Sequence, residues 1–348
     1  MWYDQKYLSL NDSSRGLWMQ YYKEEKEKER IICLLCRHYC TLKEGRIGMC
    51  GVNQNVEGKL KNLVYGHPVA LHVDPIEKKP LYHLLPGTTA LSFGTVGCNF
   101  RCPFCQNWDI SQEHEINENI YVSPEEMVAM ALEEGCSSIA YTYNEPTIFY
   151  PYAKDVGLLA KEKGLKNIYV SNGFETPEVI EDIASWLDAA NIDLKSWNDE
   201  YYRKVLKGGL EEVKDTLRRM VDAGIWVEVT TLLIEGENDS DNDIREMVEF
   251  IKNELGAHVP WHLSAFHPDY KMLDHERTQL ETLQRAKKIG KEAGLHYVYL
   301  GNVPVHGDTH CPECNELLID RTGYAITVNK LENGHCPKCQ REIEGIWK

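Results

Sequence analysis

The strongest constraint on the fold is an alternation of short apolar runs with helical patterns from residue 88 onward. The apolar runs are rich in β-branched and aromatic residues and contain few polar ones, as strands buried on both faces do. They lie at residues 88–96, 137–143, 167–171, 190–194, 225–234, 261–266 and 296–300. This alternation predicts an α/β protein with a parallel sheet, wound either open or into a barrel.

Helix boundaries between these runs are marked by capping residues. Ser123-Pro124 followed by Glu126 predicts a capping box with proline in the first helical position, and Thr176-Pro177 repeats the proline placement. The segments "AMALEEG" and "RRMVDAG" end on glycines suited to helix C-caps. No G-x-G-x-x-G follows the first strand, which argues against a dinucleotide fold.

Polar residues follow the carboxyl ends of the predicted strands. In a barrel of parallel strands, the active site forms at these ends. The polar residues there are Asn144, Glu145, Ser171, Asn172, Asp193, Lys195, Thr230, Thr231, His267 and Asn302. We therefore expect the functional site on this face of the barrel.

Eleven of the twelve cysteines fall into three groups, and the exception is Cys136, which we expect to be a small buried hydrophobe. Residues 1–18 have neither a basic nor an apolar segment, and no apolar run is long enough to cross a bilayer. We therefore expect a cytoplasmic protein without membrane attachment. In that reducing compartment, grouped cysteines favour metal binding over disulfides.

The charge balance bears on nucleic-acid binding. A net charge of −16 counts against a phosphate backbone as partner. The one obvious charge run, "KEEKEKER" at residues 23–30, mixes both signs and is interpreted as a solvated helix face.

The central cysteine group has an unusual count of three. Cys98, Cys102 and Cys105 form a C-x3-C-x2-C loop directly after the first predicted strand. Three thiolates suit a [4Fe–4S] cluster whose fourth iron is left to bind another molecule. A zinc site with a distant fourth ligand is the alternative. Nearby aromatic side chains would limit the access of water to the sulfurs.

Two further cysteine groups flank the predicted barrel and divide the chain into residues 1–87, 88–304 and 305–348. "CPEC" and "CPKC", with 21 residues between the pairs, match the spacing of a zinc ribbon. The N-terminal group is also a complete set of four ligands, for structural zinc or for an auxiliary iron–sulfur cluster. The ligands are Cys311, Cys314, Cys336 and Cys339 in the ribbon and Cys33, Cys36, Cys40 and Cys50 in the N-terminal segment.

The three-cysteine loop after a first barrel strand resembles the radical S-adenosylmethionine (SAM) superfamily. Within it, "TYNEP", "SNG", "DLK" and the histidine of "SAFHP" are similar to motifs of the activating enzymes of glycyl-radical proteins. With its four-cysteine segment before the core, the chain looks most like the radical SAM family of the AmmeMemoRadiSam system. The resemblance implies a partial (β/α)6-type radical SAM barrel with small cysteine-rich metal-binding segments at both ends.

The resemblance also implies an activity. The [4Fe–4S] cluster binds SAM and cleaves it reductively to a 5′-deoxyadenosyl radical, which abstracts hydrogen from a protein or small-molecule substrate. The residues implied in SAM binding are Tyr143, Asn144, Glu145, Ser171, Asn172, Asp193 and His267. The residues implied in catalysis are Lys195, Asp193 and His267.

The resemblance also implies partner proteins, and the chain differs from the activating enzymes in one motif. The family implies Memo-like and AMMECR1-like partner proteins and an electron donor such as flavodoxin or ferredoxin. Activating enzymes often read Asp-Thr-Asn-Gly where this chain has residues 170–173, "VSNG", so a monovalent-cation site is not carried over. Two alternatives stay open, a radical SAM enzyme that modifies RNA and a zinc-rich adaptor without catalysis.

Overall fold

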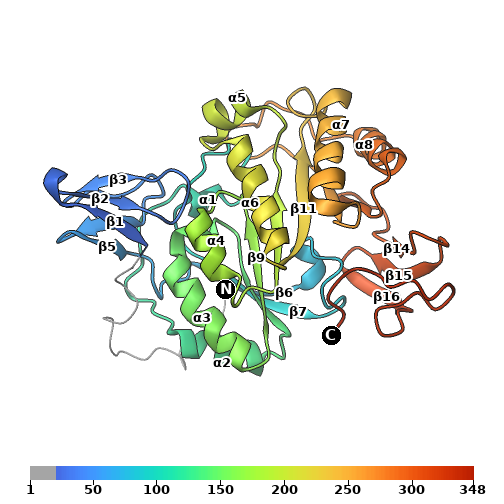
Figure 1. Ribbon diagram of the computed structural model, residues 1–348, viewed down its shortest axis with the longest axis horizontal. Helices are drawn as coiled ribbons and strands as arrows, with labels where there is room; N and C mark the ends of the chain where they lie inside the picture. Colours follow the sequence, from blue (N-terminus) through green and yellow to red (C-terminus); the bar gives the residue numbers. More distant parts are fainter. Residues whose placement is uncertain (1–20) are drawn as a thin grey trace.

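The centre of the protein is an eight-stranded sheet (Figure 1). The computed structural model describes residues 21–348. Neighbouring strands follow one another in chain order, as in an opened barrel, with seven parallel strands and one antiparallel edge strand, β6. The strands are β6 (Ala70–Pro75), β7 (Thr89–Gly94), β8 (Ser138–Tyr141), β9 (Lys166–Ser171), β10 (Ala189–Asp193), β11 (Trp226–Leu233), β12 (Trp261–Ala265) and β13 (Val298–Gly301).

All seven predicted strands are therefore confirmed, and the partial barrel with them. In this central sheet, the strand that sequence reasoning missed is β6, which lies inside the predicted N-terminal segment 1–87 and pairs with β7. The expectation that residues 1–18 hold no export signal falls outside the described residues.

Helices connect the parallel strands and cover the outside of the sheet (Figure 1). The capping box at Ser123 is confirmed, since its hydroxyl accepts from the Glu126 N–H and the Glu126 carboxylate accepts from the Ser123 N–H. The longer helices are α2 (Pro124–Glu133), α3 (Tyr150–Glu162), α4 (Pro177–Ile183), α6 (Leu210–Asp222), α7 (Asp241–Phe250) and α8 (Leu280–Ala293). The short elements are α1 (Trp108–Ser111), α5 (Asp199–Tyr201), η3 (Ile76–Lys78), η4 (Pro146–Phe149), η5 (Tyr202–Leu206) and η6 (Ile251–Gly256).

The N-terminal segment forms two small antiparallel sheets, and here one prediction is wrong. The charge run at residues 23–30 is not a helix face; it crosses β1, the turn η2 and the start of β2. The alternately buried side chains of β2, Ile31 and Cys33, pack into the core, and this tertiary packing overrides the local helix propensity of Glu and Lys. The elements are β1 (Tyr22–Glu25), η2 (Lys26–Lys28), β2 (Arg30–Cys33), β3 (Thr41–Lys43), β4 (Asn53–Val56) and β5 (Lys59–Asn62).

The C-terminal segment forms a three-stranded sheet on the opposite side of the molecule from β1–β3 (Figure 1). Its strands are β14 (Thr309–His310), β15 (Leu317–Thr322) and β16 (Ala325–Asn329). Its small core contains Leu318, Ile319 and two of the ribbon cysteines, packed against tyrosines from the barrel. Within residues 21–348, no helix combines the length and apolar character needed to cross a membrane.

Candidate active site

A cavity of about 750 Å³ lies inside the barrel at the carboxyl ends of its strands. Its volume is within the range of small-molecule sites. The wall is built by the three-cysteine loop, by the ends of β8–β13, by the segment after β6 and by the turn between β15 and β16. Most residues of the predicted polar ring therefore line the cavity; Glu145, Thr231 and His267 do not.

The three-cysteine loop is held in place by close backbone contacts. Gly97 has φ +85°, and a Cβ atom there would lie 2.5 Å from the Cys50 carbonyl oxygen, so only glycine fits. The Asn144 side-chain amide donates to the Gly97 carbonyl at 2.8 Å. The Phe100 N–H donates to the sulfur of Cys98 at 3.4 Å. Asn144 thus lines the cavity and also positions the loop.

Cys98, Cys102 and Cys105 all line the cavity. Burial raises the pKa of Cys102 to about 12, opposed by the charge of Lys195. Burial, followed by the charge of Glu145, raises the pKa of the Cys98 thiol. Metal binding here would release protons, because thiolates are the ligands. Three sulfurs on one wall of an open cavity fit a [4Fe–4S] cluster with one accessible iron.

The end of β8 carries a strained residue that faces the cavity. Tyr143 has φ +72°, an uncommon conformation for a non-glycine residue. Its hydroxyl donates to Asp74 at 2.6 Å, and the Lys79 ammonium lies 4.6 Å from its ring centroid. Burial lowers the pKa of Lys79 to about 8, although Asp74 opposes the shift. Residues from β6 and η3 therefore fix one side of the predicted SAM site.

Glu145 is fully buried and does not line the cavity. Its carboxylate accepts from the N–H groups of Asn172 at 2.8 Å and Thr147 at 3.0 Å, and from the Ser171 hydroxyl at 3.0 Å. Burial, followed by the nearby charge of Glu175, raises the pKa of Glu145 to about 8. In this arrangement Glu145 supports the end of β9 from behind; its contact with the SAM ammonium stays a prediction.

Two residues that line the cavity, Asn172 after β9 and Thr230 within β11, have side-chain oxygens free to accept a hydrogen bond from a ligand. Asn172 donates its amide to Asn99 Oδ1 at 2.7 Å, whereas its own Oδ1 is buried without a partner. Thr230 Oγ1, on β11, is also buried without a partner. Because buried polar atoms are nearly always hydrogen-bonded, these two oxygens indicate where a polar ligand binds.

Asp193 and Lys195 form an ion pair in the cavity wall, with 2.7 Å between Oδ2 and Nζ. Burial acts to lower the pKa of Lys195, but the charges of Asp193 and Cys102 outweigh it and raise the pKa above the usual value. Lys195 is therefore a fixed positive charge beside the thiols.

His267 does not itself line the cavity, but it contacts Gln106, which does. Its Nε2 is 2.9 Å from the side-chain nitrogen of Gln106, which follows Cys105 directly. The predicted roles of His267 in SAM binding and catalysis stay predictions.

Sequence reasoning missed His262, which is buried in the wall of the cavity on β12. Its Nε2 lies 2.6 Å from the Glu228 carboxylate of β11. The available signal was a histidine inside an apolar strand, which requires a buried polar partner. Arg277 and Tyr324 also line the cavity and were not predicted.

The ribbon cysteines come together as predicted. The sulfurs of Cys311, Cys314, Cys336 and Cys339 all lie within 4.8 Å of one another. Cys311 and Cys339 are 3.5 Å apart, and Cys314 and Cys336 are 3.6 Å apart. This arrangement fits a single tetrahedral metal ion.

The ribbon is attached to the barrel through Arg321, a fully buried residue of β15. Its guanidinium donates to the Tyr82 carbonyl at 2.6 Å and to the Thr309 hydroxyl at 2.7 Å, and lies 4.5 Å from the Tyr82 ring centroid. Gly323 and Tyr324 follow in the turn that reaches the cavity. The ribbon therefore supplies part of the cavity wall.

Sequence comparisons relate the chain to known proteins. Residues 93–251 match the family model of the radical SAM superfamily. Protein MJ0808 of Methanocaldococcus jannaschii is 41% identical, covering 92% of this chain and 97% of its own length. A pyruvate formate-lyase-activating enzyme of Clostridium pasteurianum is 22% identical, covering 56% of this chain and 87% of its own length.

Among solved structures, a radical SAM methyltransferase of Sphaerobacter thermophilus aligns with a TM-score of 0.49 and 20% identity, covering 62% of this chain and 66% of that one. The matched domain begins in β7 and includes all three cysteines of the loop, and it implies a [4Fe–4S] cluster and SAM as cofactors. The chain belongs to one family with MJ0808, and residues 93–251 are its radical SAM domain.

Proposed function

We propose that this protein is an enzyme of the activating-enzyme type, which uses SAM to abstract hydrogen from a protein or small-molecule substrate. One observation carries the proposal: the three loop thiols and the unpartnered oxygens of Asn172 and Thr230 belong to the same cavity. A cluster at these thiols would therefore share one cavity with the polar groups that bind a ligand.

The residues of this chain have separate tasks in the proposal. Cys98, Cys102 and Cys105 hold the [4Fe–4S] cluster, and the bound cluster with SAM supplies the one-electron cleavage that yields the 5′-deoxyadenosyl radical. Asn172 accepts a hydrogen bond from SAM. Lys195 keeps a positive charge beside the thiols, and its pairing with Asp193 fixes its position.

We also propose a metal for the ribbon, a location for the protein, and its partners. The ribbon cysteines hold zinc, which stabilises a segment with a small core of its own. Twelve cysteines without disulfides favour a reducing compartment, so we propose a cytoplasmic location. Memo-like and AMMECR1-like proteins are the proposed partners, and flavodoxin or ferredoxin is the proposed electron donor.

The test is SAM cleavage by anaerobically reconstituted protein with a chemical reductant. We expect 5′-deoxyadenosine and methionine from the wild type, and neither product from a variant with Cys98, Cys102 and Cys105 all changed to Ala. Cys136→Ala is the control, because this lone buried thiol lies outside the three groups. Cleavage by the triple variant would contradict the cluster assignment.

Substrate class is tested by deuterium transfer. Deuterated peptides, metabolites or RNA are offered in turn, and 5′-deoxyadenosine is analysed for deuterium. Transfer from a peptide or metabolite supports the activating-enzyme type. Transfer from RNA alone supports the alternative of an RNA-modifying enzyme.

A further inference from the structure

The sulfurs of the two four-cysteine groups are spaced differently. The ribbon sulfurs all lie within 4.8 Å of one another. Four thiolates around one zinc ion, each at about 2.3 Å from it, must lie about 3.8 Å apart, as the ribbon sulfurs nearly do.

The N-terminal group does not have this spacing. Among the described residues, no three sulfurs of Cys33, Cys36, Cys40 and Cys50 lie within 4.8 Å of one another, and those of the three-cysteine loop do not either. In a four-iron cluster each thiolate binds a different corner iron, which holds the sulfurs about 6 Å apart. In its sulfur spacing, the N-terminal group thus resembles the three-cysteine loop and differs from the ribbon, whose spacing suits one zinc ion.

The four N-terminal cysteines nevertheless converge. The Cys33 N–H donates to the Cys40 carbonyl at 3.0 Å, and the N–H of Met49, next to Cys50, donates to Cys40 Sγ at 3.5 Å. Burial, followed by the nearby charges of Cys33 and Cys50, raises the pKa of the Cys36 thiol, so Cys36 also lies close to the group. Cys33, Cys36 and Cys50 are buried and Cys40 is half-buried. The group is therefore gathered and shielded, but wider than one zinc ion requires.

Two of the sulfurs already accept hydrogen bonds from nitrogen donors. Cys40 Sγ accepts from Met49, and Cys50 Sγ accepts from the side-chain amide of the buried Asn53 at 3.4 Å. Such bonds stabilise a charged thiolate and tune the potential of an iron–sulfur cluster.

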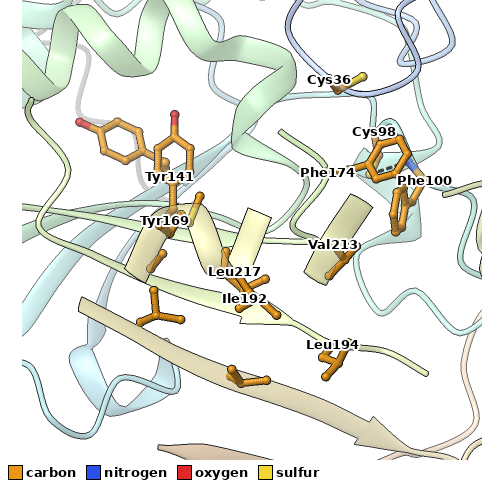
Figure 2. Packing of buried hydrophobic residues seen from close by; sticks show 14 of the residues in the cluster. Cys36, Cys98, Phe100, Tyr141, Tyr169, Phe174, Ile192, Leu194, Val213 and Leu217 are labelled. Carbon is orange, nitrogen blue, oxygen red and sulfur yellow. Dashed lines mark hydrogen bonds between the residues drawn. The ribbon is translucent and has the colours of Figure 1, made fainter. Parts of the chain in front are cut away.

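This group packs directly on the three-cysteine loop. His38, between Cys36 and Cys40, has its Nε2 at 2.9 Å from the Asn99 carbonyl oxygen and its ring 4.9 Å from that of Phe174. Phe174 in turn lies 5.3 Å from Phe100, in the loop. Figure 2 shows Cys36 and Cys98 at the same end of the core as Phe174.

We propose that Cys33, Cys36, Cys40 and Cys50 hold a second four-iron cluster rather than zinc. All four of its corners carry protein thiolates, so it has no iron open to SAM and is distinct from the cluster at the loop. The inference rests on sulfur spacing in the N-terminal segment and does not require the proposed substrate class.

Metal analysis of the full chain tests the assignment. Anaerobically reconstituted wild type should contain about eight irons and about one zinc, as two four-iron clusters and one ribbon site require. The variant with Cys98, Cys102 and Cys105 changed to Ala should keep about four irons, with a Mössbauer spectrum of a four-iron cluster that SAM does not alter. About four irons and two zincs in the wild type, or no iron in the triple variant, would overturn the proposal.

A reciprocal variant separates the two clusters. Cys36→Ala should lose about four irons while keeping a cluster whose electron paramagnetic resonance signal responds to SAM. Cys136→Ala should keep the full metal content. Loss of one zinc with no loss of iron from Cys36→Ala would contradict the assignment. If Cys36→Ala does not fold, the wild type and the triple variant still decide the question.

Discussion

The two cysteine-rich ends of the chain are joined to the barrel by different kinds of contact. The N-terminal segment touches the cluster loop through tight backbone packing, as where Gly97 meets the Cys50 carbonyl. The C-terminal ribbon is joined through buried polar groups, above all Arg321 on the Tyr82 carbonyl and His83 on the Glu344 carbonyl. The first arrangement fixes the position of the three-cysteine loop; the second attaches a small sheet, whose core includes tyrosines of the barrel, to the far wall of the cavity.

The metal of the ribbon gives the largest expected effect. Cys336 is fully buried, and its loss leaves three ligands for a site whose binding energy is largely folding energy. Cys336→Ser should release the zinc and leave residues 305–348 exposed to protease in the full-length protein. Iron content should not change, because neither iron-binding group contacts this segment's cysteines in the proposed assignment. A ribbon that stays protected without zinc would show that its own core suffices.

Arg321 tests whether the polar attachment of the ribbon is strong. Its Nε lies 3.8 Å from a carboxylate oxygen of Glu77, and neither side chain is exposed. Arg321→Ala removes the partner of a buried carboxyl group and the donor to three buried acceptors, the Tyr82 and Gly307 carbonyls and the Thr309 hydroxyl, which should cost roughly 3–5 kcal/mol of unfolding free energy. Denaturant unfolding measures this loss.

Arg245→Ala is the matched control for Arg321. Its side chain is 60% exposed and lies 3.6 Å from Asp241. We expect a change within about 1 kcal/mol, as for other surface ion pairs. Equal losses in the two variants would show that burial does not strengthen the Arg321 contacts.

Substitution of one glycine at each end of the barrel tests whether the backbone of the N-terminal segment packs more tightly than that of the ribbon. At Gly97 a Cβ would meet the Cys50 carbonyl at 2.5 Å and Val52 at 2.8 Å, whereas at Gly323, with φ +60°, nothing lies within 4 Å. Gly97→Ala should cost about 2–4 kcal/mol from strain and overpacking together, and should lower iron loading. Gly323→Ala should cost about 1 kcal/mol from backbone strain alone. Equal stability of the two variants would contradict the tight fit of the N-terminal segment.

The sequence predicted what depends on local pattern. Strands buried on both faces are continuous apolar runs, and all seven were found because their burial does not depend on which strand is the neighbour. β6 was missed because it is an edge strand with exposed His72 and Val73 and shows no such run. The charge run at residues 23–30 was misassigned because its strand β1 pairs with β2, and β2 is held in the sheet by β3, which lies further along the chain.

In the candidate site, too, positions along the chain could be predicted, whereas contacts between strands could not. Strand-end positions placed Asn144, Asn172, Asp193 and Lys195 in the cavity wall. The direction of Glu145 was not predictable, because it depends on hydrogen bonds to β9 that only the folded sheet brings together. Likewise, the spacing of cysteines along the chain does not distinguish one zinc ion from four irons, so the proposed second cluster rests on distances between sulfurs that only the fold provides.

His83 provides the smallest effect and tests the ribbon attachment by pH. This residue is fully buried, with Nδ1 at 2.7 Å from the Glu344 carbonyl oxygen and Nε2 at 2.7 Å from the Tyr299 hydroxyl. Burial lowers its pKa to about 4, although the charge of Glu228 opposes the shift. The unfolded chain, with an ordinary histidine pKa of about 6.5, therefore binds a proton that the folded protein excludes.

The difference between the folded and unfolded pKa of His83 decides how stability changes with pH. The contribution of His83 to stability is complete above about pH 6.5 and is lost as the pH falls toward about 4, because protonation favours the unfolded chain. At pH 5 the loss should reach about 2 kcal/mol. His83→Gln keeps a donor and an acceptor but cannot titrate, so its unfolding free energy should decline less between pH 7 and pH 5 than that of the wild type. Parallel pH profiles would show that the pKa of His83 is the same in the folded and unfolded protein, so that burial does not exclude the proton.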